Sequence, residues 1–499
     1  MRKLTIAMRA GVPASLGLAS QAGLACPPQR FGRRWKTRLY AMLGIVAIGT
    51  ALWLAPLYAA VRPPKLEYQR LVLPNGLVVV LHQDKSTPIV QVELWYHVGS
   101  KNEKPGRTGF AHFFEHMMFK GSKNVEPEQH TSIVASVGGQ ANAYTNEDAT
   151  VFWQTMPAQY LPLALWMEAD RMASLRVDEK MFVAEREVVK EERRMRIENP
   201  PFGLLNELIS FHAYDAHPYK HPVIGSMNDL NAATINDVRD FYNTYYVPDN
   251  ATLLIAGDFD TETVVNLVNQ YFARIPKGAQ PVPRDIPKEP MHTKERRINL
   301  EQPWPLPAVV VAYQAPYNGH PDSYPMFVMS KTLSDGQTSR IYRKLVYETG
   351  LALTAFGSSS FLEDPGIFYA VALVNPGKSP DEVEKALIAE FDKLKAEGIT
   401  ERELQRAKNQ FSRDYILSRL SIKEKASQMG HAEVIQKDMA SADGEFDTFL
   451  KVSTADTRRT AQQYFVPERR MVMRIMPKGG VEMAQGAPVA KGANGEAGK

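Results

Sequence analysis

The sequence predicts an α+β protein of two homologous-looking domains, each a mostly antiparallel sheet covered by helices, that enclose a cleft. Three observations support this prediction. The chain has 499 residues, too many for one ordinary domain, and 44% of them are hydrophobic, which is ample for packed cores. The order of strand-like and helix-like segments in residues 66–275 recurs weakly in 301–478. Residues 276–300, rich in Pro, Lys and Arg and without an apolar period, are expected to form a linker.

The first predicted domain opens with a hairpin, because two strand-like segments flank Pro74-Asn75-Gly76, a sequence typical of tight turns. Asp178 is expected to cap a long acidic helix, and Asn199-Pro200-Pro201 to end it. We expect strands at 68–73, 77–82, 89–98 and 251–257, an extended segment at 142–156, and helices at 110–120, 131–137, 160–175, 179–198 and 261–275.

The second predicted domain contains similar segments in a similar order. We expect strands at 308–313 and 366–374 and helices at 322–333, 339–347, 380–398 and 400–422. The tail at 479–499 is rich in Gly and Ala, has almost no large apolar residues, and is expected to be disordered.

The charge of the chain divides into a basic leader and an acidic remainder. The 59 Lys and Arg residues exceed the 55 Asp and Glu residues, but residues 1–65 carry ten of the basic residues and no acidic one. The rest of the chain therefore holds 49 basic and 55 acidic residues, a net charge of −6. This balance argues against nucleic acid as a partner.

Residues 1–62 have the features of an export leader. Five basic residues between Arg30 and Arg38 precede an uncharged apolar stretch at 39–60. This order is typical of a secretory signal peptide, and the stretch is also long enough for a membrane anchor. In both cases the rest of the chain is expected in the periplasm or anchored to the outer face of the inner membrane. The single cysteine, Cys26, lies in this leader, so no cysteine metal site is expected beyond it.

The pentapeptide HFFEH at residues 112–116 has a metal-binding pattern. On a helix, His112, Glu115 and His116 share one face because they are three and four residues apart. Two neutral imidazoles at this spacing bind Zn²⁺ well, and a carboxylate beside them can hold and deprotonate a metal-bound water. This is the reverse order of the HExxH zinc helix. The alternative is a half-buried helix with two hydrogen-bonded histidines.

A catalytic zinc with two histidine ligands needs a third ligand, and the acidic helix at 179–198 offers several carboxylates. Glu185 and Glu192 are seven residues apart and share one face, whereas Glu191 lies about 100° around the helix from Glu192. Spacing alone does not decide whether any of them binds metal, because a solvated helix with Glu–Arg pairs has the same pattern.

Two longer strings resemble the pitrilysin/insulinase family of zinc metallopeptidases, the inverzincins, which include mitochondrial processing peptidases. These strings are GFAHFFEHMMFKGS at 109–122 and EREVVKEERRMRIENP at 185–200. The likeness extends over roughly residues 66–475 and includes GQANAYT at 139–145, HPY at 217–219 and PVIG at 222–225. The family fold encloses a peptide cleft between its two domains.

The resemblance implies roles for individual residues. In the family the third zinc ligand follows the second histidine by 76 residues, so one Zn²⁺ per chain would be held by His112, His116 and Glu192. A further family glutamate lies seven residues earlier, at Glu185, and would support the site. Glu115 would activate a zinc-bound water. The implied activity is that of an endopeptidase acting on peptides or unstructured protein segments.

The resemblance also implies how a substrate binds. In the family a peptide adds as a strand to an edge strand beside the metal, and the matching segment here is Asn142, Ala143, Tyr144 and Thr145. Strand addition uses backbone hydrogen bonds, so its affinity depends little on the sequence of the peptide. The alternative is that this segment is an ordinary core strand.

The second half departs from the family. Complete family sites have an Arg and a Tyr seven residues apart, which clamp the substrate and stabilise the developing oxyanion. Here these positions are Val346 and Leu353, while Arg343 and Tyr347 lie at the wrong turn of the helix. The chain therefore resembles the zinc-bearing half of a two-part enzyme, completed by a related subunit with the Arg/Tyr pair, or a homodimer.

Two other functions stay open at this point. One is a non-catalytic processing or scaffold subunit of the same fold, and the intact set of His112, Glu115, His116 and Glu192 argues against it. The other is a metal-dependent hydrolase of non-peptide substrates, which the family resemblance disfavours.

Overall fold

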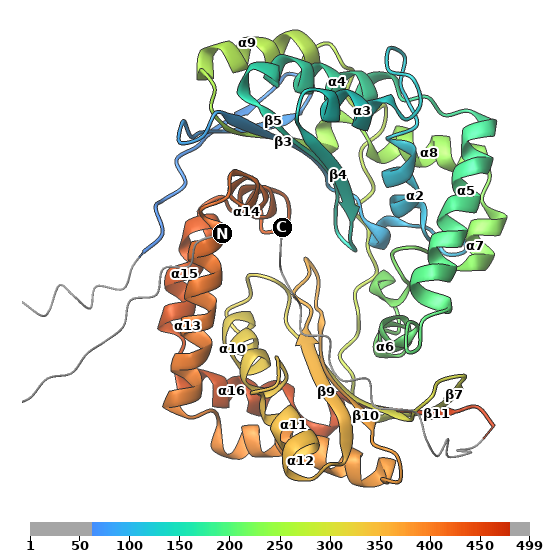
Figure 1. Ribbon diagram of the computed structural model, residues 1–499, viewed down its shortest axis with the longest axis vertical. Coiled ribbons are helices and arrows are strands. Elements are labelled where there is room, and N and C mark those ends of the chain that lie inside the picture. The colour runs from blue at the N-terminus through green and yellow to red at the C-terminus, as the bar shows by residue number, and fades with distance from the viewer. Residues whose placement is uncertain (1–61, 480–499) are drawn as a thin grey trace, which may run out of the picture. The chain divides into compact units, whose positions relative to one another are not determined.

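The computed structural model describes residues 62–479, in which helices and strands are arranged around two sheets (Figure 1). The predicted leader, with its apolar stretch at 39–60, and the tail from residue 480 onward lie outside the described residues. Among residues 62–479 no helix is long and apolar enough to cross a membrane. From Pro63 onward the described residues belong to one compact unit.

The first sheet has six strands in the order β1-β2-β6-β3-β5-β4. The strands are β1 (Gln69–Val72), β2 (Val78–Gln83), β3 (Ile89–Tyr96), β4 (Gln140–Thr145), β5 (Thr150–Pro157) and β6 (Ala251–Gly257). All neighbours are antiparallel except β2 and β6. The hairpin predicted around Pro74-Asn75-Gly76 is confirmed, since β1 pairs with β2 across it. β4 lies at one edge of the sheet, so one side of its backbone can pair with another strand.

Helices cover one face of this sheet, and the connection between β3 and β4 contains the helix with the metal-binding pattern (Figure 1). The helices of this half are α2 (Phe110–Met117), α3 (Gln129–Ser136), α4 (Leu161–Ser174), α5 (Glu179–Arg193), α6 (Leu205–Ala213), α7 (Met227–Ala232), α8 (Ile235–Tyr245) and α9 (Thr261–Phe272). One apolar core, including Leu94 of β3, Phe114 of α2 and Leu165 of α4, joins the sheet to the helices on it.

The second sheet repeats the topology of the first. It contains β7 (Arg296–Gln302), β8 (Ala308–Gln314), β9 (Ala352–Ser359), β10 (Ile367–Val374) and β11 (Arg470–Pro477), in the order β7-β11-β8-β10-β9. With β1 set aside, both sheets follow the order first, fifth, second, fourth, third along the chain, and in both the first and fifth strands are parallel. The two halves are therefore alike in topology, as predicted, and β9 corresponds to β4.

In the described part of the second half, two α-helices precede β9 along the chain and five follow β10. They are α10 (Ser323–Leu333), α11 (Arg340–Tyr342), α12 (Pro380–Glu397), α13 (Glu401–Ser418), α14 (Ile422–Val434), α15 (Ser441–Lys451) and α16 (Thr454–Tyr464), and a π-helical turn at Arg343–Glu348 follows α11. Phe368 of β10, Phe391 of α12 and Phe465 after α16 pack edge to face in the core of this half.

Each sheet is also covered by a helix from the other half. On the first sheet, Met429 of α14 lies in one cluster with Val151 of β5 and Leu254 of β6. On the second sheet, Ile209 of α6 lies in one cluster with Val310 of β8. Helices were predicted to cover each sheet, and the structure shows that one of them comes from the other half. The exchange buries apolar surface that each half would otherwise expose, and so joins the two halves.

The segment expected to be extended over 142–156 is in fact the β4–β5 hairpin. The side chain of Asn146 accepts hydrogen bonds from the backbone N–H groups of Asp148 and Ala149, which turns the chain between the two strands.

Three strands were missed, and one of them is β11, since no strand was predicted at Arg470–Pro477. β7 begins at Arg296, so the linker expected over 276–300 ends earlier, and only Ile298 and Leu300 alternate with polar residues in this strand. β9 contains Gly and two Ser residues, which are weak strand formers, and its edge position leaves several of its side chains exposed.

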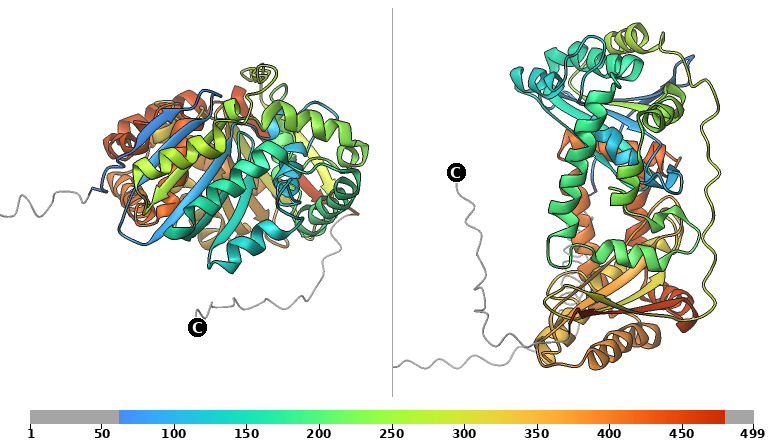
Figure 2. Two further views of the ribbon diagram at one scale, coloured as in Figure 1. Left: turned by 90° about the horizontal axis from the view of Figure 1, so that it is seen from above. Right: turned by 90° about the vertical axis from the view of Figure 1, so that its right-hand side faces the viewer.

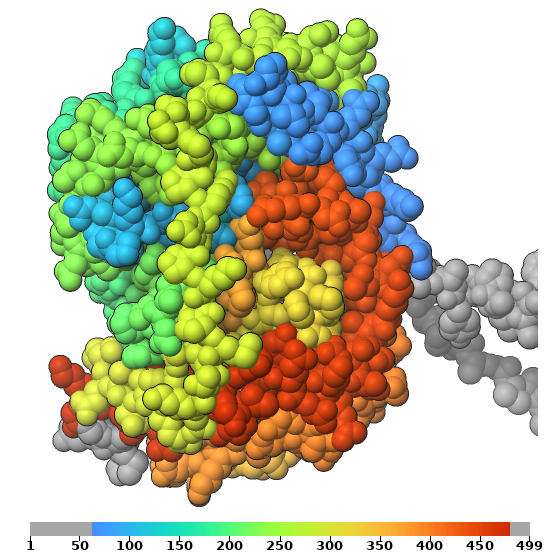
Figure 3. Space-filling view, turned by 180° about the vertical axis from the view of Figure 1, so that it is seen from behind, coloured from blue at the N-terminus to red at the C-terminus, as the bar shows by residue number. Residues whose placement is uncertain are grey.

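The connection between α9 and β7 runs along the outside of the molecule without a helix or strand (Figures 2 and 3). Ile275 and Val282 pack against the first core, and hydrogen bonds hold the rest of the connection. Arg284 donates to the carbonyl oxygen of His97, and Glu289 accepts from the backbone N–H groups of Asp215, Ala216 and His217.

One ion pair between the two halves gives a testable pH dependence. Lys425 of α14 donates to Asp84, the residue after β2, at 2.5 Å. Burial opposes ionisation of Asp84, but hydrogen bonds from Lys425 and Ser86 outweigh it and lower the pKa of Asp84 to about 2. A carboxyl whose pKa is lower in the folded state stabilises the fold above its unfolded pKa, about 3.9, and this stabilisation is lost as pH falls toward 2.

We therefore expect Asp84→Asn to lower the free energy of unfolding at pH 7 by up to about 1 kcal/mol, the range of partly exposed ion pairs. The difference from the wild type should shrink between pH 4 and pH 2. Urea unfolding of the metal-free protein over this pH range measures it, and Lys425→Met should show the same trend. A difference that does not change with pH would contradict the assignment.

Candidate metal centre

The N-terminus of α2 is fixed by Gly109 and by a buried carboxylate. Gly109 has φ 92°, in the left-handed region, and a Cβ on it would lie 2.6 Å from the carbonyl oxygen of Ile224. Glu103 accepts hydrogen bonds from the N–H groups of Gly109 and Ala111 at 2.8 and 2.7 Å. Burial raises the pKa of Glu103, and these N–H groups oppose the shift. Two of the N–H groups that a helix start leaves without a partner are thus satisfied.

The residues of α2 divide between an apolar and a polar side. Phe113, Phe114 and Met117 are buried in the core, and the ring of Phe113 lies 5.6 Å from that of Phe182 in α5. His112, Glu115 and His116 are half-buried and lie on the other side. The core thus fixes the rotation of α2 about its axis, and with it the direction of the polar side.

Helix α5 supplies the acidic side chains. Asp178 caps it as predicted, accepting from the N–H of Met181 at 2.9 Å. Phe182 and Val189 anchor it in the core. The helix expected to reach residue 198 is α-helical only to Arg193 and continues as a π-helical turn at Arg194–Glu198.

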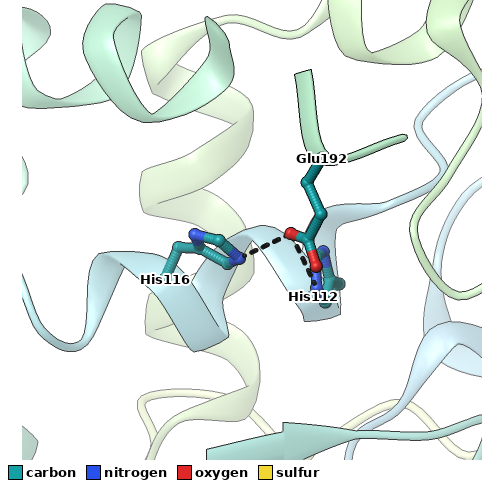
Figure 4. Close-up of side chains that lie close together, drawn as sticks. All are labelled: His112, His116 and Glu192. Atoms are coloured by element: carbon teal, nitrogen blue, oxygen red, sulfur yellow. Dashed lines mark ion pairs between the residues drawn. The ribbon is translucent and has the colours of Figure 1, made fainter. Parts of the chain in front are cut away.

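The structure brings His112, His116 and Glu192 to one point (Figure 4). Oε2 of Glu192 lies 3.2 Å from Nε2 of His116 and 3.7 Å from Nε2 of His112. In a tetrahedral site with bonds of about 2.0–2.1 Å, ligand atoms are about 3.3 Å apart. Oε2 of Glu192 is buried and has no hydrogen-bond partner among the described residues. Two imidazole nitrogens and one carboxylate oxygen in this arrangement fit zinc.

The protonation of the two histidines reflects the carboxylates around them. Burial and the nearby charge of His116 lower the pKa of His112 to about 4. Burial alone would lower the pKa of His116 as well, but Glu185 and Glu192 outweigh it and raise that pKa to about 9. Without a metal ion, a proton on His116 therefore balances the negative charge of Glu192. Metal binding has to displace this proton, so affinity should rise with pH.

Further residues hold the three ligands. Arg196 pairs with Oε1 of Glu192 at 2.6 Å and so turns Oε2 toward the histidines. Glu185 lies with one oxygen 3.3 Å from Nδ1 of His116 and with the other 2.8 Å from Nζ of Lys120. Arg196 and Lys120 were not predicted as part of the site, although the spacing of four between Glu192 and Arg196 is typical of an ion pair on a helix.

Glu191 lies away from this centre. Its side chain is 56% exposed and pairs with Arg194 at 2.9 Å. Of the two adjacent glutamates, only Glu192 faces the histidines.

Glu115 lies between the centre and the edge strand. Its Oε2 accepts a hydrogen bond from the hydroxyl of Thr145 in β4 at 2.8 Å. Burial raises the pKa of Glu115, and the hydrogen bond from Thr145 opposes this shift. Thr145 was expected only as part of a peptide-binding strand, and its hydroxyl also orients Glu115.

The segment Asn142, Ala143, Tyr144 and Thr145 belongs to the edge strand β4 rather than to a strand inside the sheet. Asn142 and Tyr144 are exposed, whereas Ala143 is buried. A cavity of about 310 Å³, lined by His112, Glu192 and Tyr219 among others, lies beside the centre.

In the second half, neither of the family's donor positions offers a hydrogen bond. Val346 lies half-buried in the π-helical turn, and Leu353 is 56% exposed on β9. Tyr347 is 63% exposed and donates to Gln337. In the described part of the chain the metal group above thus has no Arg/Tyr pair from these positions.

A second group, Asp215, Glu289 and His292, also brings three possible ligand atoms within 4.8 Å. Here Glu289 already accepts three backbone N–H groups, and Arg296 is paired with Asp215. Because these carboxylates already have partners, we interpret the group as contacts that hold the segment before β7 in place, and not as a metal site.

Comparisons with known proteins agree with this geometry. Residues 78–226 match the insulinase family (peptidase family M16), and residues 232–411 match the peptidase M16 inactive domain. The zinc protease PqqE of Helicobacter pylori is 30% identical over 439 residues, which are 87% of this chain and 98% of that protein. The uncharacterized zinc protease YmxG of Bacillus subtilis is 25% identical over 415 residues, 82% of this chain and 98% of that protein.

The fold is also similar to solved structures of peptidases. The crystal structure of a protease from Helicobacter pylori superposes with a TM-score of 0.79 and 32% identity, over 83% of this chain and all of that chain. Pitrilysin superposes with a TM-score of 0.67 over 84% of this chain and 46% of that chain, and at 18% identity this likeness shows the fold alone. The chain therefore belongs to the insulinase family of peptidases, M16.

Proposed function

We propose that the chain is a zinc-dependent endopeptidase that hydrolyses peptides or unstructured protein segments. The observation that carries this proposal is the convergence of His112, His116 and Glu192 beside Glu115, next to the edge strand β4. The relatives named zinc proteases, PqqE and YmxG, support the metal and the reaction class.

His112, His116 and Glu192 would hold one zinc ion. When bound, the ion supplies Lewis-acid chemistry to the peptide carbonyl and to water. Arg196 holds the outer oxygen of Glu192, and Glu185 orients His116 through Nδ1.

Glu115 acts as the general base. Its raised pKa makes the carboxylate a stronger base, so it can accept a proton from the attacking water and pass it to the leaving amine. Thr145 donates to one oxygen of Glu115 and so fixes the carboxylate toward the centre.

The substrate binds as an added strand on β4. The free side of β4 offers backbone N–H and C=O groups, and Thr145 at its end contacts Glu115. A peptide paired with β4 therefore passes close to the base and to the metal ligands.

The proposal is tested with the purified chain and an unstructured, fluorogenic peptide. We expect hydrolysis that a chelator abolishes and that zinc restores. Hydrolysis of a small ester but of no peptide would favour the non-peptide hydrolase. Bound zinc without any turnover, even with a partner present, would favour a non-catalytic subunit.

We further propose that a partner completes the site, since Val346 and Leu353 stand where the family has Arg and Tyr. Loss of one oxyanion donor costs about 10²–10³ in rate. We expect the chain alone to be a poor peptidase, activated by about this factor when a related subunit with the Arg/Tyr pair is added. A homodimer with full activity, unchanged by the partner, would contradict this prediction.

Glu185 gives a prediction on metal affinity. Replacing Glu185 by Gln removes the carboxylate beside Nδ1 of His116 and weakens the basicity of that ligand. We expect zinc affinity to fall by about 10–100-fold, as measured by competition with a chelating dye. Glu187→Gln, an exposed change on the same helix, is the control and should leave affinity unchanged.

For location, we propose export, based on the basic residues before the apolar stretch at 39–60. Cell fractionation with N-terminal sequencing tests this. A periplasmic protein that starts near residue 61 would support a cleaved signal, and a membrane-bound full-length chain would support an anchor. A full-length cytoplasmic protein would contradict export.

A further inference from the structure

A second cavity adjoins β4, on the face of the first sheet opposite α2. It has a volume of about 310 Å³. Trp95 and Tyr144 form its sheet side, and helices α13, α14 and α15 of the other half form the rest, with Tyr415, Gln428 and Glu445 among the lining residues. The proposed function does not use this cavity.

Strand β4 connects this cavity to the centre. Successive side chains of a strand point to opposite faces. Thr145 points to the α2 face, where it contacts Glu115. Tyr144 points to the other face, where its ring meets that of Trp95 edge to face at 6.2 Å. A peptide paired with β4 must alternate in the same way, so a residue next to one that faces Glu115 directs its side chain toward the cavity.

Two of the residues that line the cavity, Gln428 and Glu445, offer acceptor oxygens. Gln428 uses its amide N–H to donate to Ser418 at 2.6 Å, while its Oε1 is buried without a hydrogen-bond partner in the described part of the chain. Glu445 accepts one hydrogen bond, from Gln436 at 2.7 Å, and has no ion pair among residues 62–479. Burial raises the pKa of Glu445, and the hydrogen bond from Gln436 and the charge of Arg419 only partly oppose this shift.

Among residues 62–479, no Lys, Arg or His forms an ion pair with Glu445, although Arg419 lies near enough to lower its pKa. Arg419 lies behind Tyr415, but its charge is balanced by Asp443 at 3.1 Å. Glu93 lies under the Trp95 side, buried, and accepts from Trp95 and Ser427. The rings of Trp95 and Tyr144 pack edge to face along the wall, and an aromatic face carries partial negative charge that attracts cations.

We propose that this cavity binds the side chain of an arginine or lysine of the substrate, at a position next to a residue that faces Glu115. This inference rests on the proposed function. The cationic head group donates to Gln428 and pairs with Glu445, and its alkyl stem lies along Tyr144 and Trp95. An acidic side chain would be repelled by Glu445, and an apolar one would leave Oε1 of Gln428 without a donor and Glu445 without a positive charge beside it.

The first test measures binding without turnover. Labelled unstructured peptides with a single Arg or its neutral isostere citrulline, and with a single Lys or norleucine, are titrated against the zinc-loaded Glu115→Gln protein by fluorescence anisotropy. We expect the cationic peptides to bind about 10-fold more tightly or better. The preference should disappear in the double variant that also carries Glu445→Gln.

Two further variants sharpen this test. Gln428→Leu should also weaken the preference, which guards against a folding defect of the Glu445 variant. Glu433→Gln is the matched control, since Glu433 lies on α14 but pairs with Arg70. Equal affinity for Arg and citrulline peptides, or equal losses in the Glu445 and Glu433 variants, would overturn the proposal.

Cleavage by the wild-type chain, with its partner where one is needed, separates this proposal from the proposed function. Cleavage of peptides with and without Arg or Lys at equal rates would overturn the cavity proposal and leave the peptidase intact. A binding preference for cationic peptides, abolished by Glu445→Gln, without any cleavage would support the cavity and contradict the peptidase.

Discussion

Glu115→Gln should reduce peptide hydrolysis by roughly 10²–10⁴-fold while leaving zinc bound and the fold intact. The range is that of a lost general base. Gln can still accept the hydrogen bond from Thr145, so the contact between α2 and β4 is kept. Since burial raises the pKa of Glu115, its charged form is unfavourable in the folded protein, and a neutral Gln should leave the melting temperature equal or slightly higher.

The measurement combines kcat/KM on an unstructured peptide, zinc content and thermal unfolding of the same preparation. Glu187→Gln is the control, because it makes the same change at an exposed position of α5. Near-full activity of Glu115→Gln would remove Glu115 from the role of base. Loss of zinc together with activity would show that Glu115 acts on the metal site instead.

Glu192→Gln should abolish stable zinc binding, whereas Glu191→Gln should not. Glu192 points its Oε2 at both histidines, and Glu191 is turned to solvent and paired with Arg194. Loss of an outer-shell partner of a metal ligand costs about 10–100-fold in affinity, and loss of a ligand itself should cost more than this. Activity should fall with the metal content.

A stability measurement gives an independent readout of the same pair of variants. An ion that binds only the folded state stabilises the protein. Zinc should therefore raise the melting temperature of the wild type and of Glu191→Gln, but not of Glu192→Gln. Equal loss of zinc in both variants, or loss only in the Glu191 variant, would contradict the assignment of Glu192.

Much of the local structure follows from local sequence. The hairpin at Pro74-Asn75-Gly76 and the cap at Asp178 each depend on residues a few positions apart, and both occur as predicted. The shared side of His112, Glu115 and His116 likewise follows from spacing within one helix. Three strands were missed: β9 has weak strand formers, and β7 and β11 pair with each other although they lie about 170 residues apart in the sequence.

The sequence by itself determined the α+β class, the two similar halves, and the residue types of a metal-binding helix with an acidic helix 70 to 80 residues later. Spacing alone left Glu191 and Glu192 open, the family resemblance pointed to Glu192, and in the structure Glu192 faces the histidines. Only the tertiary structure showed that Arg196 and Thr145 orient the site. It also decided that each half covers the sheet of the other. The reason is physical: helix spacing fixes which side chains share a face, but the direction of that face is set by the packing of Phe113, Phe182 and Met429 against segments distant in the chain.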